Sequence, residues 1–69
     1  MNPDDIKELL DRHPFEPFRI RLGSGDAYDV QDPHSVALMK NRLFLALPTD
    51  RSVLVRYLHI AALESVQAA

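Results

Sequence analysis

The hydrophobic pattern of the first twelve residues has a helical period. Ile6, Leu9 and Leu10 form one apolar stripe of a helix, with charged residues at most of the other positions. Asn2 is a favourable N-cap, and Pro3 suits the first helical turn. The pattern therefore predicts a short amphipathic helix over about 3–12. Such a helix is marginal in water alone, so we expect it to pack against the rest of the domain.

The period changes from helix to strand within the segment His13-Pro-Phe-Glu-Pro-Phe18. Pro14 cannot continue a helix, and it disfavours helical geometry in the residue before it. The run Phe18-Arg-Ile-Arg-Leu22 then alternates as in a half-buried strand. We interpret the segment as the joint of the fold, with Phe15 and Phe18 holding the helix against a sheet, rather than as a PxxP ligand.

Short apolar runs separated by turn residues predict further strands downstream. The two glycines of 23–25 predict a hairpin turn, and Pro33 interrupts strand pairing. The expected strands cover about 17–22, 27–31, 36–40, 43–47 and 53–57. Residues 61–66 suit either a last strand or, because of their alanines, a helix. We favour a tight turn at 58–60 followed by a strand. One helix and about five strands with closely spaced turns are typical of a small barrel.

Two of these runs are apolar without alternation, Leu43-Phe-Leu-Ala-Leu47 and Val53-Leu-Val55. Strands of this kind are usually covered on both faces. One short helix can cover little, and a chain of 69 residues builds a marginal core. We therefore predict self-association by an added strand edge or a packed face, with the helix as the alternative cover. The candidate interface residues are Leu43, Phe44, Leu45, Leu47, Val53, Leu54 and Val55.

The net charge of −2 is distributed unevenly. Residues 1–16 have a balance of −3, and residues 17–69 have a balance of +1. Proteins that neutralise nucleic-acid phosphates usually have a clear basic excess, so the charge does not favour such a partner, although a local patch is compatible with it. The chain has no cysteine, and no apolar run approaches the ~20 residues of a membrane span. Because the N-terminus also lacks the features of a signal peptide, we expect a cytoplasmic protein without membrane contact.

No arrangement of side chains points to catalysis. His13, His34 and His59 are far apart, and Asp32-Pro-His34 is explained more simply by a turn than by a metal site. The serines lie in turns without a nucleophile elbow. We therefore predict a protein that is not an enzyme and has no cofactor or metal.

Two resemblances are visible. Pro14-Phe-Glu-Pro-Phe-Arg-Ile20, Gly25 and Leu58-His-Ile60 resemble a set of short uncharacterised bacterial proteins with a Pro-Phe-x-Pro-Phe-Arg/Lys-Ile segment. Val55-Arg-Tyr-Leu-His-Ile-Ala-Ala-Leu63 resembles the last motif of Sm-like barrels, with Tyr57 in place of a glycine. The second resemblance implies an N-terminal helix, five bent strands and rings built by pairing strand edges between subunits.

Together these observations predict one domain over 1–69, mainly β, a small SH3-like or Sm-like barrel of about five strands with one N-terminal α-helix. Its expected function is that of a non-catalytic interaction module that forms a homo-oligomer and binds a protein partner. The alternative is an Sm-like protein that binds RNA or single-stranded nucleic acid by phosphate contact and base stacking. Its candidate contacts are Arg19, Arg21, Arg56, Tyr57 and His59.

Overall fold

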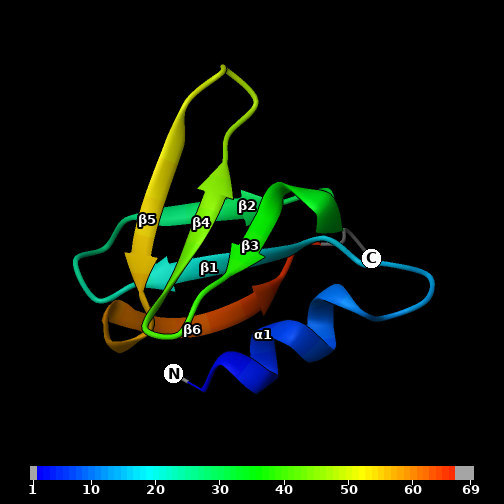
Figure 1. The fold of residues 1–69 in the computed structure, drawn as a ribbon, viewed down its shortest axis with the longest axis horizontal. Helices are drawn as coiled ribbons and strands as arrows, with labels where there is room; N and C mark the ends of the chain where they lie inside the picture. Colours follow the sequence, from blue (N-terminus) through cyan, green and yellow to red (C-terminus); the bar gives the residue numbers. More distant parts are fainter. Residues whose placement is uncertain (1, 67–69) are drawn as a thin grey trace.

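One helix, six strands and two short 3-10 turns form the part of the chain that the computed structural model describes, residues 2–66 (Figure 1). In chain order they are α1 (Pro3–Leu10), β1 (Phe18–Leu22), β2 (Ala27–Val30), η1 (Pro33–Ser35), β3 (Val36–Leu38), β4 (Arg42–Ala46), β5 (Ser52–Arg56), η2 (Tyr57–His59) and β6 (Ile60–Ser65).

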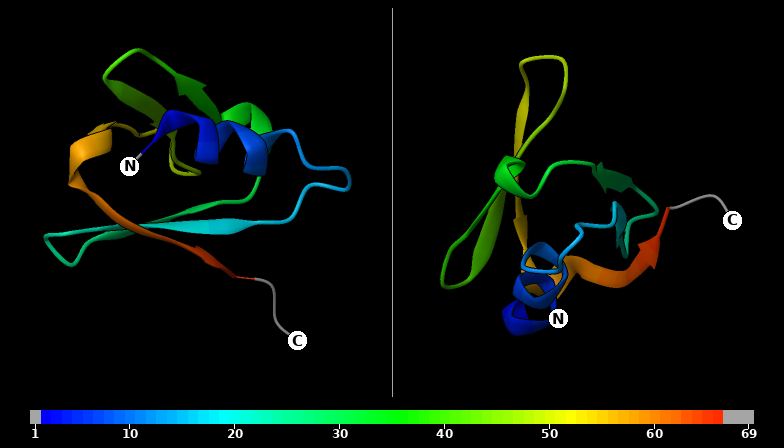
Figure 2. Two further views of the ribbon diagram at one scale, coloured as in Figure 1. Left: turned by 90° about the horizontal axis from the view of Figure 1, so that it is seen from below. Right: turned by 90° about the vertical axis from the view of Figure 1, so that its right-hand side faces the viewer.

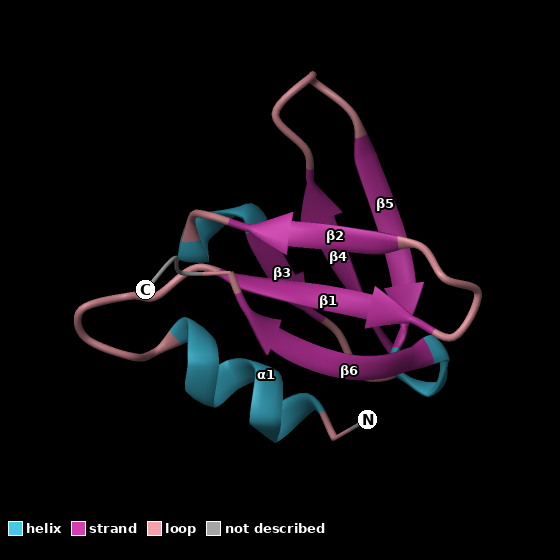
Figure 3. Cartoon of the chain, turned by 180° about the vertical axis from the view of Figure 1, so that it is seen from behind, coloured by secondary structure: helices cyan, strands magenta, loops and turns pink. Residues whose placement is uncertain are grey.

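The strands form two antiparallel sheets of three strands each, in the orders β2-β1-β6 and β3-β4-β5. The sheets face one another, and α1 lies along the opening between them on one side (Figure 2). Seen from behind, β1 lies between its two partners, and the β4–β5 hairpin extends past the first sheet (Figure 3). The molecule is therefore mainly β with one short N-terminal helix.

The structure differs in two respects from the expected small barrel of about five strands. The described residues form six strands, and no strand pairing joins the two sheets. The physical reason lies in η1, which separates β2 from β3. Pro33 has no N–H to donate to a sheet, and the Asp32 side chain instead accepts a hydrogen bond of 2.8 Å from the backbone N–H of His34. The 3-10 turn η2 separates β5 from β6 in the same way.

The helix and the last strand differ in detail from their expected bounds. The helix ends at Leu10, with Asp11 as its C-cap, instead of continuing to residue 12. Asn2 is the N-cap, and its side chain accepts a 3.0 Å bond from the backbone N–H of Asp4. Of the two alternatives at the C-terminal end, the strand is the one that forms, as β6 after η2. Residues 67–69 lie outside the described residues.

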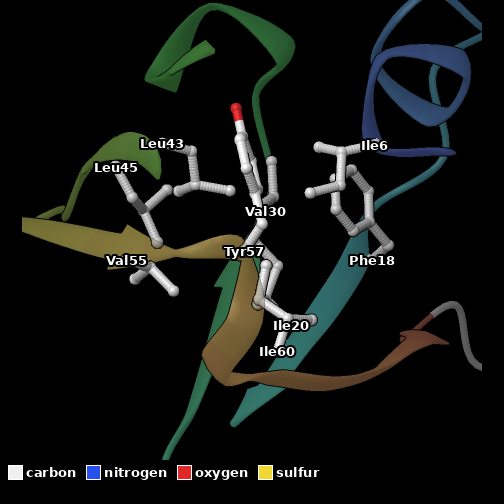
Figure 4. Close-up of a cluster of buried hydrophobic side chains, with 9 residues drawn as sticks. All are labelled: Ile6, Phe18, Ile20, Val30, Leu43, Leu45, Val55, Tyr57 and Ile60. Atoms are coloured by element: carbon white, nitrogen blue, oxygen red, sulfur yellow. The ribbon is translucent and has the colours of Figure 1, made fainter. Parts of the chain in front are cut away.

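A single cluster of buried side chains fills the space between the sheets and the helix (Figure 4). Ile6 is fully buried and joins α1 to the strands. Phe18 begins β1, and its ring lies 6.2 Å from that of Phe15 in an edge-on arrangement, which places the joint segment against the core. The cluster consists of Ile6, Phe18, Ile20, Val30, Leu43, Leu45, Val55, Tyr57 and Ile60.

The helix should therefore stabilise the fold chiefly through Ile6. We expect Ile6→Ala to lower the free energy of unfolding by about 2–5 kcal/mol, because it removes a fully buried side chain and leaves a cavity. Leu58, which is 87% exposed, supplies the control, and Leu58→Ala should change stability little. Urea unfolding followed by circular dichroism measures both, and equal losses would contradict this role of Ile6.

Candidate functional site

The β4–β5 hairpin contains all seven residues that the sequence suggests as an interface. Figure 1 shows β5 on the outside of the molecule, with the hairpin loop projecting from the body. Within the hairpin, Leu43 pairs with Val55 and Leu45 pairs with Val53. Leu43 and Leu45 are fully buried, and Val55 is 4% exposed. These three residues belong to the protein's own core rather than to its exposed surface.

The opposite face of the hairpin has an apolar pair at its centre, in which Leu54 is exposed and Phe44 is partly buried. Phe44 lies directly across from Leu54, and Ala37 of β3 pairs with Phe44 on its other side. Leu54 is 56% exposed, although it is a large apolar residue. Leu47 and Val53 are partly buried against the core. Of the seven candidates, Phe44 and Leu54 are therefore the two that face outward from the sheet.

Only one of the two suggested strand edges is available. The strand β4 lies in the middle of its sheet, paired with β3 on one side and β5 on the other, so the edge suggested at 43–47 is not free. The strand β5 is at the border of that sheet, and within residues 2–66 no strand pairs with its outer side. A free edge presents unpaired N–H and C=O groups that another strand can pair with.

The hydrogen-bond pattern identifies those free groups. The N–H of Leu47 donates to the carbonyl of Arg51, and the N–H of Tyr57 donates to that of Asn41, at 2.7 and 3.4 Å. In an antiparallel pair, hydrogen-bonded and non-hydrogen-bonded positions alternate. Positions 53 and 55 therefore bond to β4, whereas the N–H and C=O groups of Ser52, Leu54 and Arg56 point away from it.

The other strand edges in the described residues are shorter or partly covered. The strands β3 and β2 have three and four residues. The strand β6 is longer, but Leu9 of α1 and Leu63 of β6 line the same shallow hollow, which places the helix against this strand. The edge of β5 is thus the longest one without such cover.

The first sheet has a polar outer surface built on two ion pairs. Arg19 Nε lies 2.7 Å from Asp29 Oδ1, across β1 and β2. Arg21 donates from Nε and Nη2 to the two carboxylate oxygens of Glu64 on β6, at 3.0 and 3.1 Å. The hydrogen bond from Arg19 lowers the pKa of Asp29, and that from Arg21 lowers the pKa of Glu64. Both arginines therefore already have carboxylate partners.

The five residues suggested for nucleic-acid contact do not form one surface. Arg19 and Arg21 belong to the first sheet, whereas Arg56 lies on the second. Tyr57 is only 5% exposed, and its hydroxyl donates a 2.6 Å bond to the carbonyl of Met39. Figure 4 shows its ring within the core cluster, with the hydroxyl oxygen at the periphery. The ring of Tyr57 is therefore packed in the core and is not presented to a base for stacking. His59 is exposed on η2.

The surface of the described residues is hollowed in several places. One hollow of about 770 Å³ lies beside β2 and the start of the β4–β5 loop, where Tyr28 and Pro48 are among its walls. In the portion of the chain with described coordinates, no three His, Asp or Glu side chains gather as metal ligands. Across that same portion, no helix has the length and apolar character needed to cross a membrane.

The sequence reading overlooked Lys40 and Arg42, which share one hollow with Arg56 at the end of the second sheet. Only the β4–β5 register brings Arg42 opposite Arg56. One signal for this was present in the sequence. Arg42 and Arg56 each lie just outside an apolar run, at equal distances from the hairpin loop.

Comparison with known proteins returned no match: no family model, no curated protein and no solved structure corresponds to this chain.

The lowered pKa of Glu64 predicts a specific pH dependence of stability. A carboxylate whose pKa is lower in the folded state stabilises the fold above its unfolded pKa, and this contribution is lost as the pH falls through the folded value. Glu64→Gln should therefore reduce the free energy of unfolding at neutral pH, and the difference from the wild type should vanish in acid, once the pH lies below both the unfolded and the folded pKa of Glu64. Urea unfolding over a pH series measures this difference.

Glu8→Gln is the matched control, because Glu8 has no ion pair in the structure as described. Its stability should follow the wild type at every pH. If the free energy of unfolding of Glu64→Gln changes with pH in the same way as that of the wild type, the Arg21–Glu64 pair contributes nothing to stability.

Proposed function

We propose that the protein is a non-catalytic interaction module that self-associates through the free edge of β5. The observation behind this proposal is the combination of an unpaired edge with an exposed apolar side chain at its centre. Leu54 directs its backbone groups outward in the plane of the sheet, and its side chain is 56% exposed on the outer face. A second copy of the chain can both pair with these backbone groups and cover the side chain of Leu54.

The composition of β5 supports pairing with another strand. Natural edge strands are usually protected by proline, lysine, a bulge or an inward charge. In β5 the one charged side chain is Arg56 at the end of the strand; the run Ser52-Val-Leu-Val55 has no proline, charge or bulge, and its pairing with β4 keeps one continuous register. Small domains also often gain stability by oligomerisation, because their own core is limited. The edge therefore has the properties of an interface rather than those of a protected border.

Two β5 strands can pair antiparallel about a twofold axis at Leu54. This pairing gives hydrogen-bond partners to the outward N–H and C=O groups of both strands. Leu54 then faces its own copy, and Ser52 of each chain faces Arg56 of the other. All three positions have outward N–H and C=O groups, so this register forms about six main-chain hydrogen bonds. On the outer face the two Leu54 side chains become neighbours, and a six-stranded sheet results.

The alternative of nucleic-acid binding on the five residues suggested by the sequence gains no support from their positions. Arg19 and Arg21 would have to leave their carboxylate partners, and Tyr57 would have to leave the core. We therefore do not propose that surface.

The proposal is tested with Leu54→Pro. Because the N–H of Leu54 points away from β4, proline at this position removes a bond to the second copy but none within the hairpin. Light scattering at micromolar concentration should give the mass of a dimer for the wild type and that of a monomer for the variant. Circular dichroism should show that both remain folded.

Leu58→Lys is a matched control, since Leu58 is exposed but lies outside the paired strand. It should remain dimeric, whereas Leu54→Lys, which places a charge at the twofold axis, should be monomeric. A monomeric wild type, or a dimer that survives both substitutions of Leu54, would refute the proposal.

A further inference from the structure

A group of cations without counter-ions lies at one end of the second sheet. Arg42 of β4 and Arg56 of β5 are directly opposite one another, and both are exposed. Lys40 and Asn41, in the turn between β3 and β4, line the same hollow of about 280 Å³, together with Met39. We call Lys40, Arg42 and Arg56, with Asn41, the basic cluster.

The basic residues of the N-terminal segment and of the first sheet contrast with this cluster. Lys7, Arg12, Arg19 and Arg21 each form an ion pair with a carboxylate. Among residues 2–66, no carboxylate lies within ion-pair distance of Lys40, Arg42 or Arg56. The fold thus pairs the cations of the helix and first sheet, and it leaves those of the cluster unpaired.

The position of the two arginines is unfavourable for the isolated domain. Because positions 53 and 55 bond to β4, Arg42 and Arg56 form a non-hydrogen-bonded pair, the type in which Cα atoms are closest, at about 4.5 Å. Like charges directly opposite in such a pair destabilise a sheet. An anion bound between them would turn this repulsion into attraction.

The turn that presents the cluster is held in place by the core. The hydroxyl of Tyr57 donates to the carbonyl of Met39, and the backbone N–H of Tyr57 donates to the carbonyl of Asn41, at 2.6 and 3.4 Å. The N–H of Met39 closes the turn by donating to the carbonyl of Arg42 at 2.8 Å. The cluster therefore rests on a positioned scaffold, which reduces the entropy lost when a ligand binds.

An apolar surface adjoins the cluster on the same face. Phe44 and Leu54 form the next cross-strand pair of this face, two residues further along each strand. Two residues of an antiparallel strand span about 7 Å. A ligand with an anionic group on the arginines can thus lay a flat apolar group over the phenylalanine and the leucine.

We propose that the basic cluster binds the phosphate group of a nucleotide, with the base resting on Phe44 and Leu54. Three cations exceed what one carboxylate can neutralise, whereas a phosphate monoester has nearly two negative charges and three acceptor oxygens. The cluster is local and the net charge of the chain is −2, which favours recognition of one nucleotide unit over a long polyanion. The site lies on the face of the sheet and does not depend on pairing at the edge of β5.

The test is an NMR titration of the ¹⁵N-labelled protein with adenosine 5′-monophosphate. Shifts should concentrate on residues 39–44 and 54–56, and adenosine without phosphate should bind far more weakly. Arg42→Gln combined with Arg56→Gln should weaken binding at least about tenfold, because two charge-assisted contacts are lost. This variant should also remain folded and melt at a higher temperature without ligand, since the like-charge pair is gone.

Arg51→Gln is the matched control, because Arg51 also lacks an ion pair in the described structure and lies at the loop end of the same hairpin. It should leave the affinity within about twofold of the wild type, since it removes only a distant charge. Shifts centred on Arg19 and Arg21, or equal losses for Arg51→Gln and the double variant, would overturn the site.

Two further probes separate the sources of the phosphate. The first probe is a single-stranded oligonucleotide. If it binds more tightly than the monophosphate, and the same variants weaken its binding, the phosphate belongs to a nucleic-acid strand. A free nucleotide is the source if the two bind equally. A polyglutamate that binds as tightly as either, with the same variants impaired, would show that the cluster accepts acidic protein and would refute phosphate recognition.

Discussion

The register of β4 against β5 determines the rest of the molecule. With Leu43 opposite Val55, every second residue of the hairpin enters the core, and the residues between them face outward. The same alternation decides which backbone groups of β5 bond to β4 and which point to solvent. A shift of the register by one residue would expose Leu43 and Leu45 and bury Arg42, which no small core can tolerate.

The two proposed surfaces of the hairpin are compatible because they use different directions. Backbone groups of β5 lie in the plane of the sheet, whereas the side chains of Arg42, Phe44 and Leu54 stand away from it. A second copy at the edge would leave the outer face open. Pairing of two β5 strands would also extend the apolar row of that face across the twofold axis, so that each copy contributes one basic cluster to a common surface.

Local signals in the sequence predicted the mainly β fold and the N-terminal helix. The N-cap Asn2, the proline at position 14 and the alternation from Phe18 act within a few residues, so they are readable without tertiary structure. The sequence also indicated an unusual apolar surface at the hairpin. It could not assign Leu43 to the core and Leu54 to the surface, because both faces of the strands are apolar.

The features that escaped prediction all depend on contacts between distant residues. The separation into two sheets follows from turns that interrupt pairing, and it requires knowing which strands meet. The burial of Tyr57 depends on the carbonyl of Met39, eighteen positions earlier in the chain. The partners of Arg19 and Arg21 come from β2 and β6, so their availability for a ligand could not be judged from spacing.

Amide hydrogen exchange along β5 at two protein concentrations tests the central claim most directly. We predict that the N–H groups of Val53 and Val55 are protected at both concentrations, because they donate to β4. Those of Leu54 and Arg56 should exchange rapidly in dilute protein and become protected in concentrated protein, as the edges pair. Equal exchange of all four groups, or exchange of Leu54 that does not depend on concentration, would contradict the account.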